Sequence, residues 1–167
     1  MNIGFIAPSP CEAQRSSVLS TALWLHELAP WTHAVTLTFK RSDSKGQTVS
    51  EQIIVESLRH FLRVLDKRCY GGPKVRRGAY IPSVVVIGWG AYNDHPHAHL
   101  AFACPEEHTH KAFDRFIDIA ADATDWIDRE RRIEPYRNQG WAEYMLNHGF
   151  DNLITNLTRA HQPEIVG

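Results

Sequence analysis

The sequence lacks the features that mark several classes of protein. It has only three cysteines, Cys11, Cys69 and Cys104, and their spacing matches neither a disulfide scaffold nor a cysteine-rich zinc site. No apolar stretch approaches the roughly 20 residues of a membrane span, and the N-terminal residues lack the basic start of a signal peptide. We therefore expect a cytoplasmic protein that has no contact with a membrane.

An excess of charge of either sign is also missing. Lysine and arginine number 18 and aspartate and glutamate 19, so the formal net charge is −1. Such a balance gives no overall attraction to nucleic acid or to anionic membranes, and any charge-driven binding needs a local patch. The length of 167 residues and the hydrophobic content of 43% fit a single domain with its own core.

The periodicity of apolar residues predicts helices and strands in a mixed order. Apolar side chains recur at helical spacing in some segments and on alternate positions in others. We expect a turn-rich basic loop at 71–78. The expected helices cover 16–28, 50–69, 108–132 and 139–149, and the expected strands cover 31–41, 81–89 and 97–104. This order predicts an α+β fold, with a mostly antiparallel central sheet of about five strands and helices packed on its faces.

The strand expected at 97–104 has histidines at alternate positions. His97, His99 and Ala101 share one face of this strand, because strand side chains alternate between faces. His97 and His99 are separated by about 6.5–7 Å along a strand, from which two imidazoles can converge on one ion. His95 would extend the set to about twice that length, so a third ligand is expected from another element.

Three segments in this order resemble the HUH endonuclease superfamily, which includes rolling-circle replication initiators that nick DNA through a single tyrosine. The strand carrying His97-Ala98-His99 is similar to the histidine motif of that superfamily. The threonine-rich segment 33–40 is similar to its first motif, and 139–147, which contains Tyr144, is similar to its tyrosine helix. The resemblance spans about 31–150, within one nuclease domain of residues 1–167 that has an N-terminal helical segment (1–30) and a tail (151–167). It implies a ferredoxin- or RRM-like fold.

The resemblance implies a chemistry for these residues. His97 and His99 would hold Mg²⁺ or Mn²⁺ at a DNA phosphate, and Tyr144 would attack the phosphate to leave a 5′-phosphotyrosine and a free 3′-OH. Members of the superfamily usually carry a lysine shortly after the tyrosine, where this chain has Asn147 and His148. His148 lies one helical turn after Tyr144 and is expected to accept a proton or contact the phosphate.

Several assignments stay open at this point. The third metal ligand is expected to be His95 or Asp94, and Tyr136 is an alternative nucleophile. The expected partner is single-stranded DNA at an origin or hairpin. Because the chain has no phosphate-binding loop of the form GxxxxGKS or GxxxxGKT, a separate helicase would unwind the duplex. The residues expected to contact DNA are Lys74, Arg76, Arg77 and Arg137.

Two alternatives use the same residues differently. His95, His97 and His99 also match the alternating pattern of histidine-triad nucleotide hydrolases, in which the middle histidine, here His97, attacks the α-phosphate. Pro96 is awkward in that pattern, because a proline inside a strand removes a backbone donor. The second alternative is a catalytically inactive replication accessory that keeps the fold for DNA binding.

Overall fold

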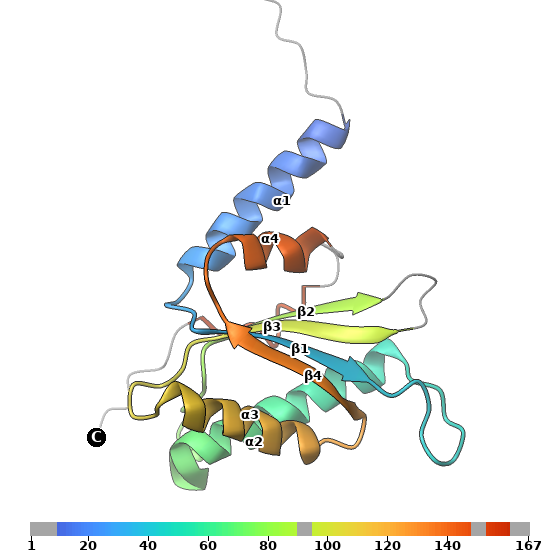
Figure 1. The fold of residues 1–167 in the computed structure, drawn as a ribbon, viewed down its shortest axis with the longest axis vertical. Coiled ribbons are helices and arrows are strands. Elements are labelled where there is room, and N and C mark those ends of the chain that lie inside the picture. Colours follow the sequence, from blue (N-terminus) through green and yellow to red (C-terminus); the bar gives the residue numbers. More distant parts are fainter. Residues whose placement is uncertain (1–9, 90–94, 148–152, 161–167) are drawn as a thin grey trace, which may run out of the picture.

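The computed structural model describes residues 10–89, 95–147 and 153–160. Helices and strands alternate irregularly along the chain (Figure 1). In chain order they are α1 (Pro10–Glu27), β1 (His33–Phe39), α2 (Glu51–Arg76), β2 (Ser83–Trp89), β3 (Pro96–Phe102), α3 (His110–Asp122), β4 (Ile127–Pro135) and α4 (Gly140–Asn147). The fold is therefore α+β, as the sequence predicts.

One antiparallel sheet of four strands forms the centre of the described part of the chain. The strand order is β2-β3-β1-β4, so the two central strands are β3 and β1. The sheet separates two helical layers. Helices α2 and α3 cover one face, and α1 and α4 lie over the other (Figure 1). The predicted number of about five strands is thus corrected to four for the sheet in the described residues.

The larger core lies between the sheet and the α2/α3 layer. Alternate positions of β1 and β3 point into it, which is the pattern of strands whose two faces differ. α2 begins at the N-cap Ser50 and α3 at the N-cap Thr109, and each cap side chain accepts a backbone N–H three residues on. The largest fully buried side chains of this core include Leu37, Leu58, Phe61, Leu100, Phe102 and Phe113.

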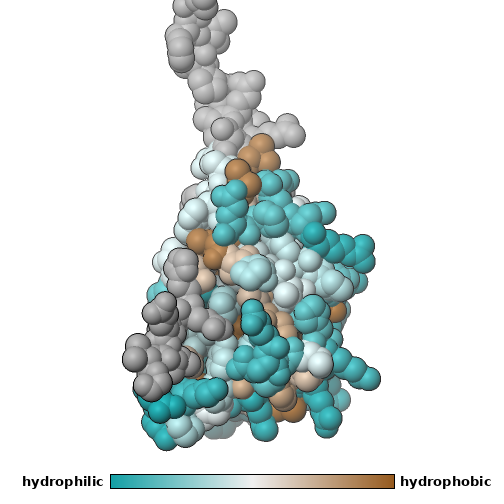
Figure 2. All heavy atoms as spheres, turned by 90° about the vertical axis from the view of Figure 1, so that its left-hand side faces the viewer, coloured by the Kyte–Doolittle hydropathy of each residue, from teal (hydrophilic) through white to brown (hydrophobic). Residues whose placement is uncertain are grey.

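A second, smaller core lies between the other sheet face and the α1/α4 layer. Ala22 and Leu25 of α1 and Met145 of α4 are buried there, against Val86 and Ala101 of the sheet. α1 extends away from the body, and its far part is not covered (Figure 1). Three large apolar side chains of α1 are exposed, namely Leu19, Leu23 and Trp24. Figure 2 shows hydrophobic atoms in the upper part of a flank that is otherwise largely hydrophilic.

The segment 153–160 lies along the outer edge of β2. Ser83 exchanges backbone hydrogen bonds with Arg159, and Val86 forms a bridge with Leu153. The Arg159 guanidinium also donates to the buried carboxylate of Asp66 at 2.6 Å, and Asp66 accepts the Ile81 N–H. This pairing covers an edge whose backbone groups would otherwise be open to another chain.

Two sequence predictions are wrong. The helix expected over 108–132 ends at Asp122 as α3, and the chain returns as the edge strand β4. Arg131 on β4 faces α3, where it donates to Asp118 and Asp122 at 2.6 and 2.8 Å. Because a charged residue occupies this inward position, the strand lacks the alternation of apolar and polar residues by which strands are predicted. The basic loop expected at 71–78 is mostly helical, because α2 kinks at Gly71 (φ 78°) and continues to Arg76.

None of the helices in the described residues is long and apolar enough to cross a membrane.

Candidate functional site at the histidine face of the sheet

The two predicted ligands lie on the sheet face below α4. In the register of the sheet, His97 is opposite Thr38 on β1 and Gly88 on β2, and His99 is opposite Thr36 and Val86. Residues directly opposite one another point to the same face. Ala98 and Leu100, the neighbours of His99 in the strand, point into the larger core on the other side. The expected division of β3 into a histidine face and an apolar face is confirmed.

The ring of His97 has a defined orientation. Its Nδ1 lies 2.9 Å from the backbone carbonyl oxygen of His95, so Nδ1 carries the proton and donates it. In the neutral imidazole Nε2 then has the lone pair, which is the form that binds a metal ion. The ring crosses Gly88, where a Cβ would lie only 2.3 Å from Nε2. A glycine at this position therefore makes room for the imidazole.

His99 is more deeply buried than His97. Its exposed fraction is 2%, and its Nδ1 lies 3.1 Å from the Thr36 hydroxyl oxygen on the neighbouring strand. This hydrogen bond holds the ring in place from the side of β1. The His97 and His99 ring centroids are 4.8 Å apart, with an interplanar angle of 69°. The pair is close enough for the two imidazoles to converge on one ion.

Helix α4 brings the predicted nucleophile to the histidines. Ala142, Met145 and Leu146 are buried against the sheet, which fixes the rotation of the helix about its axis. Tyr144 then lies beside His99, with ring centroids 5.0 Å apart, while its side chain stays 45% exposed. Trp141, one turn earlier, stacks on Tyr144 at 5.3 Å. His99 and Tyr144, 45 residues apart in the chain, thus lie side by side.

This arrangement combines three chemical capacities. Two neutral imidazoles can bind a divalent cation. A phenol that is accessible from solvent can act as a nucleophile towards phosphorus. The aromatic rings of Trp141 and Tyr144 offer flat surfaces to a nucleobase.

The third metal ligand is not supplied by the described residues. Across residues 10–89, 95–147 and 153–160, no group of three histidine, cysteine, aspartate or glutamate side chains is arranged to hold a metal ion. The His95 ring lies against the Arg41 guanidinium, with Nε2 at 2.7 Å from Nη2. Asp94, the other candidate ligand, and His148, the expected proton acceptor, lie outside the described residues.

Tyr136 has a different environment from Tyr144. Its hydroxyl lies 3.1 Å from Nδ1 of His26 on α1, and the two rings stack. Burial raises the pKa of Tyr136 to about 12. A phenol with a raised pKa forms its nucleophilic anion less readily, so this residue is better suited to joining α1 to the body.

The predicted DNA-binding residues do not form one surface. Lys74 and Arg76 lie in the last turn of α2, and Arg77 caps that helix. α2 packs on the sheet face opposite the histidines, so these three residues belong to the other layer (Figure 1). Arg137 lies on the histidine side, where it lines a cavity together with Trp141.

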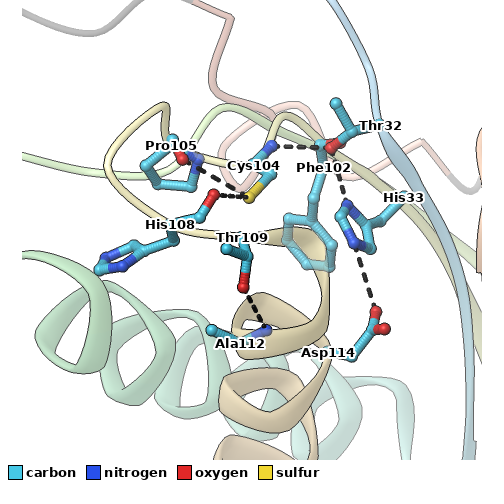
Figure 3. Close-up of polar contacts among 9 residues, drawn as sticks. All are labelled: Thr32, His33, Phe102, Cys104, Pro105, His108, Thr109, Ala112 and Asp114. Carbon is cyan, nitrogen blue, oxygen red and sulfur yellow. Dashed lines mark hydrogen bonds and ion pairs between the residues drawn. The ribbon is translucent and has the colours of Figure 1, made fainter.

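A second histidine network, which sequence reasoning did not identify, joins the start of β1 to α3 (Figure 3). The His33 ring is buried between the Thr32 hydroxyl at 2.7 Å and the Asp114 carboxylate at 3.3 Å. The Thr32 oxygen also accepts the Cys104 N–H at 2.8 Å. Each polar group in this network has a partner within the fold, which is typical of a structural joint.

Comparisons of the chain with protein-family models, with curated proteins and with solved structures found no match.

Proposed function

We propose that the chain is a metal-dependent endonuclease that nicks and rejoins single-stranded DNA through a 5′-phosphotyrosine on Tyr144. One observation carries the proposal: the Tyr144 ring lies 5.0 Å from the His99 ring, and the His99 ring lies 4.8 Å from that of His97. The proposed nucleophile on α4 and the two proposed metal ligands on β3 thus lie together on one face of the sheet. A packing tyrosine alone would not require this proximity.

The proposed reaction exchanges one phosphodiester for another. The Tyr144 oxygen attacks the scissile phosphorus, the bond from phosphorus to the 3′ oxygen breaks, and the leaving oxygen takes up a proton. The phenol proton passes to His148 or to solvent. Attack of the free 3′-OH on the phosphotyrosine reverses these steps, so joining requires no external energy source. His97 and His99 would hold Mg²⁺ or Mn²⁺, which neutralises charge on the phosphate oxygens.

The orientation of the His97 ring suits a metal ligand. The hydrogen bond from Nδ1 of His97 to the His95 carbonyl leaves Nε2 in the metal-binding form. A neutral imidazole suits Mn²⁺ better than Mg²⁺, because Mg²⁺ favours oxygen ligands. We therefore expect stronger activity with Mn²⁺ at equal concentration.

The topology supports the same proposal. Between β1 and β4 the elements follow the order β-α-β-β-α-β, and the strand order in the sheet is β2-β3-β1-β4. Both features are typical of the ferredoxin-like arrangement that the resemblance to HUH endonucleases implies. The partner would be an origin or hairpin in single-stranded form, opened by a separate helicase.

The two alternatives draw less support. A histidine-triad hydrolase needs His95 in the same group as His97 and His99, whereas the His95 ring contacts Arg41. An inactive DNA-binding accessory would have no need for an accessible tyrosine beside a buried histidine, which is the arrangement of Tyr144 and His99. The experiment below separates these functions.

The test is covalent capture of DNA. A pool of single-stranded oligonucleotides labelled at the 3′ end is incubated with the protein and Mn²⁺, and labelled protein is detected after denaturation. Wild type is expected to form an adduct, Tyr144→Phe none, and Tyr136→Phe as much as wild type. An adduct that survives Tyr144→Phe contradicts the assignment of the nucleophile. Release of nucleoside monophosphate from a phosphoramidate without any adduct would favour the histidine-triad alternative.

A further inference from the structure

A cavity of about 540 Å³ lies next to the candidate site on the same face of the sheet. Its size falls within the range of pockets that bind small molecules, roughly 300–1,000 Å³. It is lined by Ala34, Glu134, Pro135, Arg137, Asn138 and Trp141, together with Gly140. Neither the proposed metal site nor the proposed nucleophile uses this cavity.

The sheet register places the cavity relative to the histidines. Ala34 lies two residues before Thr36 on β1 and is directly opposite Glu134 on β4, so these side chains point to the histidine face. Trp141 belongs to both places, because it lines the cavity and its ring centroid is 5.5 Å from that of His99. A DNA strand held at the metal site would therefore be separated from the cavity only by the Trp141 ring.

The lining carries the groups that a nucleotide needs. Trp141 offers a flat surface for stacking. Glu134 offers a carboxylate with two acceptor oxygens, and Arg137 offers a cation for a phosphate. The small side chain of Ala34, directly opposite Glu134, leaves space at the sheet surface.

We propose that this cavity binds one unpaired guanine of the DNA strand and so sets the sequence that the enzyme recognises. The inference rests on the proposed nicking function, whose substrate it specifies. Guanine has two adjacent N–H donors on its pairing edge, which match the two oxygens of one carboxylate. Adenine and cytosine present one amino donor beside an acceptor, and thymine one donor between two acceptors, so each would leave a carboxylate oxygen facing an acceptor.

The present contacts of Glu134 do not prevent this role. Its carboxylate forms an ion pair with Arg132 on the same strand, at 3.8 Å, and both side chains are more than half exposed. Such surface ion pairs contribute little to stability, so a base that brings two donors can replace the contact. Asn138 accepts the Gly140 N–H through its side-chain oxygen at 2.9 Å, which fixes the loop that forms the end of the cavity.

The experiment measures binding of fluorescent thymidine oligonucleotides of about 15 nucleotides, longer than or comparable to typical single-strand sites. The central base is guanine, adenine, cytosine or thymine, and EDTA is present so that no strand is cut. We expect the guanine oligonucleotide to bind on the order of tenfold more tightly than the other three. Glu134→Gln is expected to remove this difference, so that the four oligonucleotides bind with equal affinity.

Glu130→Gln is the matched control. Glu130 lies on the same strand as Glu134, is likewise exposed, and is not among the residues that line the cavity. It should keep the preference for guanine. Equal binding of all four oligonucleotides by wild type, or a guanine preference that survives Glu134→Gln, overturns the inference.

The covalent capture assay on the same oligonucleotides separates this inference from the proposed function. Adducts that form equally with all four central bases would support nicking and overturn the guanine pocket. A guanine preference that depends on Glu134, found without any adduct, would support the pocket and contradict the nicking function.

Discussion

Gly88 offers the sharpest test of how the histidine site is built. In Gly88→Ala the new Cβ would lie 2.3 Å from Nε2 of His97 and less than 3 Å from two of its ring carbons. Carbon and nitrogen atoms in contact are separated by about 3.5 Å, so the ring has to move by about an ångström. A movement of this size also disturbs the hydrogen bond from Nδ1 to the His95 carbonyl, at present 2.9 Å.

The structure limits what this movement costs the fold. His97 is only partly buried, so its ring can turn towards solvent and the added methyl group need not compress the core. Loss of one hydrogen bond costs about 1 kcal/mol, and replacing a strand glycine by alanine returns roughly 0.5–1 kcal/mol. We expect the free energy of unfolding to change by less than about 1 kcal/mol. Metal affinity should fall by about 10- to 100-fold, as for other changes that misalign a ligand.

Three measurements check this prediction. Urea denaturation gives the stability, calorimetric titration with Mn²⁺ gives the affinity, and imidazole NMR of His97 reports the ring directly, whether or not metal binds. Gly72→Ala on α2 is the control, because its Cβ would meet only the mobile end of Arg76, at 3.4 Å. Unchanged His97 resonances in Gly88→Ala would refute the reasoning, as would a loss of several kcal/mol of stability.

Two further predictions concern the other histidines. Thr36→Val keeps the shape of the side chain but removes the hydroxyl next to buried His99, so the free energy of unfolding should fall by about 1–3 kcal/mol in a urea titration. Thr38→Val is the control. The Thr38 hydroxyl donates to the Glu130 carbonyl at a more exposed position, so its loss should lower the free energy of unfolding by less. Burial lowers the pKa of His33 below 6.5, despite Asp114 and with a further contribution from His110. The unfolded chain then binds the proton more readily, so stability should decrease as the pH falls through about 6.5 and level off below the folded pKa. Denaturation of wild type and His33→Gln across this pH range checks the sign, and an identical pH dependence in both would count against it.

The parts of the site that the sequence predicts are those encoded by short-range patterns. Alternation alone places His97 and His99 on one face of a strand, and helical periodicity identifies the element that carries Tyr144. The contributions of Thr36 and Gly88 come from cross-strand register, which joins segments about 60 and 10 residues away from the histidines. No pattern within a single segment identifies them.

The wrong assignment of β4 has a related cause. In the segment 127–135 most side chains are exposed, and the inward Arg131 is stabilised by two aspartates of α3. An edge strand of this kind has little apolar alternation, and its charges protect the edge from pairing with another chain. Its identity as a strand depends on pairing with β1, whose residues lie about 95 positions earlier. The place of Glu134 on the histidine face likewise follows from that pairing and from no pattern within its own segment.

The two buried histidines of the central strands differ in the helices that cover them. His33 and His99 each have a threonine oxygen within hydrogen-bond distance of Nδ1, and both are almost fully buried. His33 faces the α2/α3 layer, where its ring packs on Phe113 and its Nε2 pairs with the Asp114 carboxylate, so its polar atoms are used by the fold. His99 faces the shorter α4, which covers it with a tyrosine that is itself 45% exposed. The histidine face of the sheet therefore presents an aromatic side chain that a ligand can contact directly above a buried imidazole, whereas His33 is held in an ion pair.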